Sequence, residues 1–222
     1  MPYRFLELEI SWLGHDAFRI KKDVAVYIDP YQIQVGEPKA DIVFITHEHF
    51  DHCEPASIKR VLKPSTIVVA PGVAKPCVNK VTQNMLEISP GETRDVGSLQ
   101  VVAYPAYNLN KFRDPSRGVV FHPKEDGRVG YLIEWGGVKI FHVGDSDFVP
   151  EFREVRADVV FVPVSGVYVM TPQEAAEFVN TIKPKVAIPM HYGAIVASRR
   201  EAEEFRRLVA PGIEVVILER EI

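Results

Sequence analysis

The chain has 222 residues, of which 46% are hydrophobic and 25% are charged, and its 26 Lys plus Arg against 30 Asp plus Glu give a formal charge of −4. This is the composition of an ordinary globular protein, and the slight acidity argues against a polybasic protein that binds nucleic acid. No apolar stretch reaches the roughly 18 residues of a membrane span, and the N-terminal sequence has no signal-peptide core, so we expect a cytoplasmic protein without a membrane segment.

Short runs rich in Val and Ile, bounded by Gly, Pro, Asp and Asn, predict that strands dominate the fold. In chain order the predicted strands are Leu6–Leu13, Ala17–Ile20, Val24–Ile28, Asp41–Thr46, Thr66–Ala70, Leu99–Tyr104, Val129–Trp135, Val138–Val143, Asp158–Val164, Val186–Met190 and Glu214–Leu218. The predicted helices are Pro55–Leu62, Pro172–Ile182 and Ser198–Val209. The second helix has the clearest start, with Thr171 as N-cap and Glu174 three residues later.

A weak internal repeat divides these elements into two halves. Ala40–Ile45 matches Ala157–Val162, and after each copy comes a predicted helix that ends in Lys-Pro. The alternative is that buried strand–helix units have similar short sequences only because their amino-acid composition is similar. If the repeat is real, residues 1–222 form one domain with a pseudo-two-fold repeat, in which each half is a sheet with outer helices and the two sheets pack face to face.

Cys53 and Cys77 are the only cysteines. Two cysteines are too few for a disulfide scaffold, so we expect free thiols in a reducing compartment. Cys53 is interpreted as a buried residue at the start of a helix.

The strongest chemical motif is His-x-His-x-Asp-His at His47–His52, directly after a predicted buried strand. Side chains two residues apart on an extended segment point the same way, so His47 and His49 are expected to bind one metal ion. Asp51 and His52 lie at the turn into the next helix and can face a second ion. A structural zinc site is disfavoured, because such sites have four protein ligands and are rich in Cys.

Two further candidate ligands follow later strands. Asp145 comes after the strand that ends at Val143, and its two carboxylate oxygens can bridge two ions. His191 follows Val186–Met190 and is interpreted as a ligand rather than a core histidine. Asp29 also ends a strand, and we interpret it as a residue that orients a ligand.

Together these motifs resemble the metallo-β-lactamase fold superfamily of metal-dependent hydrolases. Trp12–His15, Phe141–Asp145 and Pro189–Tyr192 are similar, more narrowly, to the ascorbate-6-phosphate lactonase-like proteins. The resemblance implies an α/β fold, a four-layer αβ/βα sandwich of two β-sheets with helices on the outer faces. It also implies two metal sites, the first formed by His47, His49 and Asp145, and the second by Asp51, His52, Asp145 and His191.

One departure from the family pattern leaves the first site incomplete. The superfamily usually has a His after the strand that here runs Leu99–Tyr104, whereas this chain has Pro105-Ala106-Tyr107-Asn108. We expect His122 to replace it, because His122 lies on the same connection before the stiffening Pro123. The alternatives are the amide oxygen of Asn108, or a first site completed by water or substrate with His122 on the surface.

Two divalent ions held in this way predict a hydrolase that uses a metal-bridged hydroxide on a small ester, lactone or phosphoester. Asp51 is expected to handle the proton of that hydroxide, His15 to line the site and donate a proton, and His142 to support the ligands. Nitrogen and oxygen ligands suit Zn²⁺ best, with Mn²⁺ or Fe as alternatives. The competing functions are a nuclease, an iron-dependent oxidoreductase of the same superfamily, and a non-catalytic metal-binding protein.

One irregular stretch, Asn108–Arg128, stands out for its Asn, Asp, Pro, Ser and Gly and its basic side chains. Loops of this length inside compact domains are often lids or binding loops. Its basic residues are Lys111, Arg113, Arg117, Lys124 and Arg128. The first four are predicted to attract an anionic small-molecule substrate, with a solvated surface loop as the alternative. No nucleic acid or membrane partner is expected, and the sequence does not predict an oligomeric state.

Overall fold

The computed structural model describes residues 1–221 and divides the chain into two compact units. Unit 1 comprises Met1–Ile88 and the C-terminal residues from Leu218 onward, and unit 2 comprises Ser89–Ile217. Each unit is built on one seven-stranded mixed sheet.

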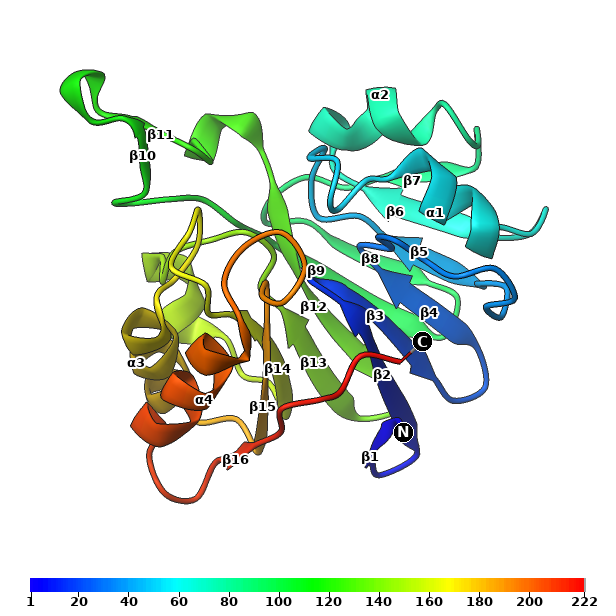
Figure 1. Cartoon of the computed structure of the whole chain (residues 1–222). Coiled ribbons are helices and arrows are strands. Elements are labelled where there is room, and N and C mark those ends of the chain that lie inside the picture. Colours follow the sequence, from blue (N-terminus) through cyan, green and yellow to red (C-terminus); the bar gives the residue numbers. More distant parts are fainter. Residues whose placement is uncertain (222) are drawn as a thin grey trace. The chain divides into compact units, whose positions relative to one another are not determined.

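The sheet of unit 1 follows the chain order from β1 to β7 (Figure 1). Its strands are β1 (Tyr3–Phe5), β2 (Leu8–Gly14), β3 (Ala17–Lys21), β4 (Ala25–Ile28), β5 (Ile42–Phe44), β6 (Ile67–Ala70) and β7 (Met85–Glu87). Strands β1 to β4 pair antiparallel, and β4 to β7 pair parallel. The connections between the parallel strands contain the helices α1 (Pro55–Val61) and α2 (Lys75–Val78) and the 3₁₀ turn η1 (Gly72–Ala74).

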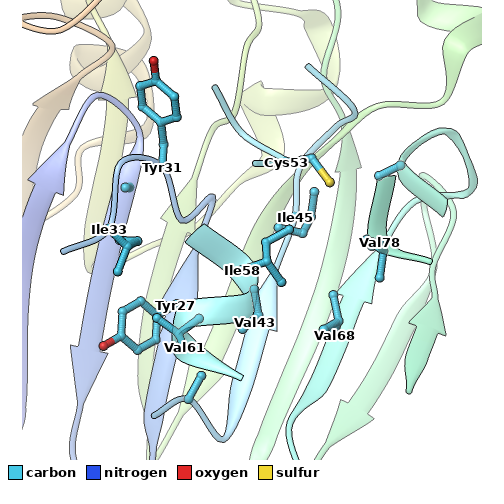
Figure 2. Close-up of a cluster of buried hydrophobic side chains, with 14 of the residues drawn as sticks. Tyr27, Tyr31, Ile33, Val43, Ile45, Cys53, Ile58, Val61, Val68 and Val78 are labelled. Atoms are coloured by element: carbon cyan, nitrogen blue, oxygen red, sulfur yellow. The ribbon is translucent and has the colours of Figure 1, made fainter. Parts of the chain in front are cut away.

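Figure 2 shows the apolar layer between these helices and the sheet of unit 1. Ile58 and Val61 of α1 and Val78 of α2 are fully buried together with Val43 and Val68 of the parallel strands. Because side chains alternate along a strand, Val43 and Val68 give the helices one continuous apolar face on which to pack. This packing fixes α1, and with it the loop that joins β5 to α1.

The sheet of unit 2 has the order β16-β15-β14-β13-β12-β9-β8. Its strands are β8 (Thr93–Val96), β9 (Leu99–Pro105), β12 (Val129–Trp135), β13 (Val138–His142), β14 (Val159–Pro163), β15 (Val186–Met190) and β16 (Glu214–Val215). The unit also contains helices α3 (Pro172–Ile182) and α4 (Arg199–Leu208), the small hairpin of β10 (Phe112–Asp114) and β11 (Val119–Val120), and the 3₁₀ turns η2 (Pro115–Arg117), η3 (Lys124–Asp126) and η4 (Pro150–Glu154).

Helix α3 begins as its sequence predicts. Thr171 accepts a hydrogen bond from the Glu174 N–H, and the Glu174 side chain accepts one from the Thr171 N–H, which forms a capping box. Phe178 on the buried face of α3 packs against Phe141 of β13, with ring centroids 6.3 Å apart, and against Phe152 at 5.7 Å. The aromatic contacts therefore hold α3 on the face of the sheet that Phe141 occupies.

The two sheets share one pattern of pairing. In unit 1 the antiparallel pair β3–β4 is followed by the parallel strands β5 and β6, and in unit 2 the antiparallel pair β12–β13 is followed by the parallel strands β14 and β15. Two mixed sheets, each with its own helices, confirm the predicted α/β fold class. The single-domain organisation with an internal repeat stays a prediction.

The sequence located the long central elements and missed the short ones. Val129–Trp135, Val186–Met190 and Pro172–Ile182 begin and end as predicted, and the other predicted elements differ at their ends. The missed elements are β1, β7, β8, β10, β11 and α2. Each of them has two to four residues, which is too short for an apolar period to stand out.

The prediction of two free thiols is wrong, because Cys53 and Cys77 form a disulfide. Cys53 is buried, as predicted, directly before α1, and Cys77 lies on α2. The spacing of two cysteines 24 residues apart does not reveal this pairing, which depends on the loop before α1 meeting α2 in the folded unit. The cytoplasmic location stays a prediction, and free thiols no longer support it. Among the described residues, no helix combines the length and apolar character that crossing a bilayer requires.

Candidate metal centre

Unit 1 gathers polar side chains at two turns that follow strands. The first is the turn from β2 to β3, where Gly14 has φ +109° and His15 has φ +54°. The side chain of Trp12 donates a hydrogen bond to the His15 carbonyl (Nε1–O 2.8 Å), which holds the turn closed. His15 and Asp16 are both fully buried there.

The second turn carries the His-x-His-x-Asp-His motif between β5 and α1. The backbone N–H groups of His52 and Cys53 donate to the His49 carbonyl at 3.0 and 2.8 Å, so the chain reverses directly after His49. We call the polar residues of these two turns, together with Asp29, the N-terminal cluster. Its members are His15, Asp16, Asp29, His47, His49, Asp51 and His52.

Asp29 orients two histidines of the N-terminal cluster through hydrogen bonds. Its carboxylate accepts hydrogen bonds from the Thr46 N–H (2.8 Å), the Thr46 hydroxyl (2.6 Å) and His52 Nδ1 (2.8 Å). Because the Thr46 hydroxyl donates to Asp29, its oxygen accepts the Nδ1–H of His47 at 3.0 Å. Asp29 therefore fixes His52 directly and His47 through Thr46, which is the orienting role expected of such a carboxylate.

The metal-facing atoms of the N-terminal cluster fall into two groups. His47 Nε2 lies 3.1 Å from His49 Nδ1. Asp51 Oδ2 lies 3.0 Å from His15 Nε2 and 3.8 Å from His52 Nε2. The motif thus separates in space as its spacing predicts, with His47 beside His49 and Asp51 beside His52.

Unit 2 brings together three candidate ligands from separate connections. Asp145 follows β13, His191 follows β15, and His122 lies on the connection between β11 and β12. Asp145 Oδ2 lies 3.4 Å from His191 Nε2 and 3.6 Å from His122 Nε2. We call these three residues, together with Asn108 and Ser165, the C-terminal cluster.

Asn108 and Ser165 hold the two histidines of the C-terminal cluster. Asn108 Nδ2 donates to the Tyr168 carbonyl, so Asn108 Oδ1 is the acceptor for His122 Nδ1 at 2.9 Å. The Ser165 hydroxyl donates to the Val167 carbonyl, so its oxygen accepts the Nδ1–H of His191 at 2.9 Å. Both imidazoles are thereby set with Nε2 as the unprotonated nitrogen that faces Asp145.

The two candidates for the missing ligand, His122 and Asn108, are hydrogen-bonded to each other. His122 is buried, with 1% of its surface exposed, which makes the alternative of a surface histidine wrong. Both the backbone N–H and Nδ1 of His122 donate to Asn108 Oδ1, so the amide oxygen that would have been the other ligand is occupied in orienting His122.

Local backbone conformation also marks these positions. His15, Asp29 and His191 have φ values of +54°, +44° and +60°. Left-handed conformations of non-glycine residues cost about 1 kcal/mol each and cluster at functional sites. In β12, a Cβ at Gly130 would lie 2.5 Å from the Val143 carbonyl oxygen, so only glycine lets β12 approach the chain that leads into Asp145.

Several residues of the two clusters were missed by sequence reasoning. Asp16, Thr46 and Ser165 carry no recognisable spacing, although Asp16 and Thr46 each lie beside a histidine that was identified. Polar residues next to predicted ligands are thus the detectable signal, and Ser165 offers none. His142, predicted to support the ligands, is buried and accepts the Gly144 N–H at Nδ1 (3.2 Å), so it contacts the turn before Asp145.

The irregular stretch Asn108–Arg128 is more ordered than its sequence suggests. It contains the β10–β11 hairpin, which extends away from the sheet of unit 2 in Figure 1. Asp147 holds its root, because Asp147 Oδ2 accepts the N–H groups of Leu109 (2.7 Å) and Asn110 (3.1 Å).

Most of the basic side chains of this stretch form ion pairs. Lys111 pairs with Asp147 at 3.1 Å and Glu174 at 2.8 Å, and Lys124 pairs with Glu151 at 2.6 Å. Arg128 pairs with Asp126 at 3.1 Å. Arg113 and Arg117 are exposed on the hairpin, so they are the two cations whose charge remains available to an anion in solution.

The donor sets of both clusters fit divalent metal ions. Two ligand atoms about 2.1 Å from one ion, at 90–110° to each other, lie about 3 to 3.5 Å apart, and the separations of 3.1, 3.4 and 3.6 Å described above match this range or lie just beyond it. His47, His52, His122 and His191 each direct Nδ1 at a protein oxygen. That arrangement is typical of metal-ligating histidines, whose other nitrogen carries the lone pair.

Comparison with known proteins gives consistent results. A family model described as a beta-lactamase superfamily domain matches residues 9–191. The UPF0173 metal-dependent hydrolase of Methanopyrus kandleri is 31% identical over 96% of this chain and 97% of its own length, and that of Archaeoglobus fulgidus is 28% identical over 95% and 96%. A crystal structure of a candidate metal-dependent hydrolase from Parabacteroides distasonis superposes with a TM-score of 0.80 at 29% identity, over 96% of this chain and 94% of that one.

Proposed function

The chain belongs to the metallo-β-lactamase superfamily and is a metal-dependent hydrolase, and from this premise we propose that it uses two divalent ions to hydrolyse a small anionic ester, lactone or phosphoester. The observation that carries the proposal is the hydrogen bonding of four histidine rings. Each of His47, His52, His122 and His191 has its Nδ1 held by a protein oxygen, so that Nε2 is available to an ion. The narrower similarity to the ascorbate-6-phosphate lactonase-like proteins stays a prediction.

The proposed ligand sets keep those implied by the family pattern and add one residue. His47, His49, His122 and Asp145 would hold the first ion, and Asp51, His52, Asp145 and His191 the second. Nitrogen and oxygen donors of this kind suit Zn²⁺, and they also accept Mn²⁺ or Fe²⁺. Bound ions supply hydroxide near neutral pH and polarise the bond to be broken.

Asp51 and His15 are the proposed proton-handling pair. Their side chains lie 3.0 Å apart (Asp51 Oδ2 to His15 Nε2), and His15 is fully buried whereas the Asp51 side chain is 14% exposed. Asp51 would orient the attacking water and accept its proton, and His15 would return a proton to the leaving group. The contact between them lets one proton pass from the carboxylate to the imidazole.

An anionic substrate is supported by the exposed cations of the β10–β11 hairpin. Arg113 and Arg117 lie on this hairpin, and among the described residues neither side chain forms a hydrogen bond or ion pair with another charged group. Lys111 and Lys124 are proposed to contribute less to substrate attraction, because Asp147, Glu174 and Glu151 already neutralise them.

A substrate screen with a catalytic variant tests this function. The protein loaded with zinc, manganese or iron is assayed against phosphodiesters, including nucleic acid, and against lactones and thioesters. We expect turnover of a small anionic substrate, and we expect Asp51→Asn to lower kcat by about 100-fold or more while the folding midpoint is retained. Asp95→Asn, which removes an exposed carboxylate from β8, is the control. An unchanged rate in Asp51→Asn would remove Asp51 from the chemistry, and exclusive cleavage of nucleic acid would replace the proposed substrate class.

A further inference from the structure

We propose that Asp16 is a further metal ligand in the N-terminal cluster, adding a carboxylate to the ion that His52 holds. The inference rests on the proposed function, since it assumes that His52 binds an ion. Neither the His-x-His-x-Asp-His motif nor the family pattern assigns a role to this residue.

The turn between β2 and β3 is built to place Asp16. Strand pairing shifts register between Trp12 and Gly14, so the hairpin bulges immediately before Asp16. Gly14 and His15 both have positive φ values, which tight hairpin turns commonly use but which cost a histidine about 1 kcal/mol. Such strained backbone is typical of positions where a side chain has to be held in one direction.

Asp16 is fully buried, with 0% of its side chain exposed. Removing a carboxylate from water costs several kcal/mol unless a cation compensates for it. The side chains of unit 1 that lie near its carboxylate are the imidazoles of His15 and His52. A divalent ion at this position would compensate both for Asp16 and for Asp51.

Distances within unit 1 agree with ligation. Asp16 Oδ2 lies 3.5 Å from His52 Nε2 and 3.8 Å from His15 Nε2. Both separations exceed the 2.7–3.2 Å of a normal N–H···O hydrogen bond, and the first falls at the upper end of the spacing of two ligands on one ion. His52 Nδ1 is bound to Asp29, so Nε2, the atom that faces Asp16, carries the lone pair.

An additional carboxylate changes which ion the site prefers. With Asp16 added to the proposed ligands Asp51, His52, Asp145 and His191, this ion would have three carboxylates and two imidazoles. Carboxylate ligands favour harder ions, so Mn²⁺ or Fe²⁺ gains relative to Zn²⁺. A carboxylate that ligates the ion stabilises the metal-bound protein relative to the metal-free protein.

Asp16→Asn and Asp16→Ser test the assignment in the full-length protein. Mn²⁺ and Zn²⁺ are titrated by calorimetry into metal-free wild type, both variants and the control Asp95→Asn, which removes an exposed carboxylate from β8. One binding event should weaken by at least about tenfold for Mn²⁺ and by a smaller factor for Zn²⁺. The melting temperature of the metal-free variants should stay equal to that of wild type or rise, because a buried charge has been removed.

Two outcomes would overturn the inference. Unchanged affinities for both ions in Asp16→Asn and Asp16→Ser would show that Asp16 is not a ligand. A fall in the metal-free melting temperature with unchanged affinities would make Asp16 a structural residue of the turn. Failure of the proposed metal centre is distinguishable from both, because wild-type protein would then itself bind neither ion, and failure of the proposed reaction would appear only in the substrate screen.

Discussion

The N-terminal and C-terminal clusters present similar histidines by different means. The N-terminal cluster takes His47, His49, Asp51 and His52 from one short loop, and a single buried carboxylate, Asp29, sets two of its rings. The C-terminal cluster takes each ligand from a different connection, and a neutral side chain holds each ring, Asn108 for His122 and Ser165 for His191. The first cluster therefore draws its ligands from one loop and supports them with a charged residue, whereas the second draws them from several connections and supports them with neutral residues.

The difference predicts different sensitivities. A hydrogen bond from imidazole to a carboxylate is about twice as strong as one to a neutral oxygen and makes the ring a more basic ligand. The loop of the N-terminal cluster is also joined to a disulfide, because Cys53 follows His52 directly. Cys77→Ser, Asp29→Asn and Ser165→Ala test how far these features separate the two clusters, and further variants test the surroundings of the C-terminal cluster.

The largest effect should come from the Cys53–Cys77 disulfide. It closes a loop of about 24 residues, and constraining the unfolded chain over this length is worth about 3 kcal/mol. Cys77→Ser should lower the free energy of unfolding by this amount in urea titrations. Adding a thiol reductant to wild type should reproduce the loss and leave Cys77→Ser unaffected. Equal unfolding midpoints for wild type with and without reductant would show that the disulfide does not stabilise unit 1.

Replacement of the supporting residues compares the clusters directly. Asp29→Asn should weaken metal binding by about 100-fold, because it replaces a charged acceptor that serves His52 and, through Thr46, His47. Ser165→Ala, which affects His191 alone, should weaken binding by about tenfold. Calorimetric titration with Zn²⁺ measures both. Losses of equal size, or a larger loss in Ser165→Ala, would contradict the distinction between charged and neutral support.

Glu174 gives unit 2 a pH dependence. Partial burial opposes ionisation of its carboxyl, but hydrogen bonds from Asn110, Lys111 and the Thr171 N–H outweigh burial and lower the pKa of Glu174 from 4.5 to about 2. Since the folded-state pKa is lowered, this stabilisation is complete above about pH 4.5 and is lost as the pH falls toward 2.

Glu174→Gln should therefore cost about 1 to 2 kcal/mol at pH 7 and flatten the acid limb of stability between pH 4.5 and 2. Thermal melts over this pH range measure the effect. Glu177→Gln on the same helix is the control. If the stability of Glu174→Gln fell as steeply between pH 4.5 and 2 as that of wild type, other carboxyl groups would be responsible for the loss.

The smallest effect concerns the β10–β11 hairpin. Arg113→Ala should raise KM for an anionic substrate by a few-fold, with a smaller difference at high salt, because an exposed cation acts at long range. Lys111→Ala should instead lower stability, because Lys111 pairs with Asp147 and Glu174. If Arg113→Ala and Arg117→Ala both left KM unchanged, the hairpin would have no role in attracting substrate.

The sequence predicts the N-terminal cluster better than the C-terminal one for a physical reason. Ligands that share one loop have a fixed spacing, so His47 to His52 can be identified from that spacing alone. His122 and Ser165 come together with Asp145 and His191 only after β12, β14 and β15 have paired, and no spacing records that. His122 was inferred because a usual ligand was missing, and Asn108, its rival, proved to be its hydrogen-bond partner.

The same reasoning explains the other errors. The central strands and α3 carry long apolar periods and a capping box, so their bounds follow from local sequence. The Cys53–Cys77 pair, Asp16 and the ion pairs of Lys111 are tertiary contacts between segments that local patterns treat as independent. In each case the residue type was visible and its partner was not.

Metal analysis of native protein tests the central claim most directly. Protein purified without chelator is compared with Asp145→Ala and with the control Asp95→Asn by mass spectrometry of bound metals. We predict close to two divalent ions per chain for wild type and Asp95→Asn, and clearly fewer for Asp145→Ala, because its carboxylate is proposed to serve both ions. A wild-type protein without bound ions, or an Asp145→Ala variant that retains two, would contradict the account.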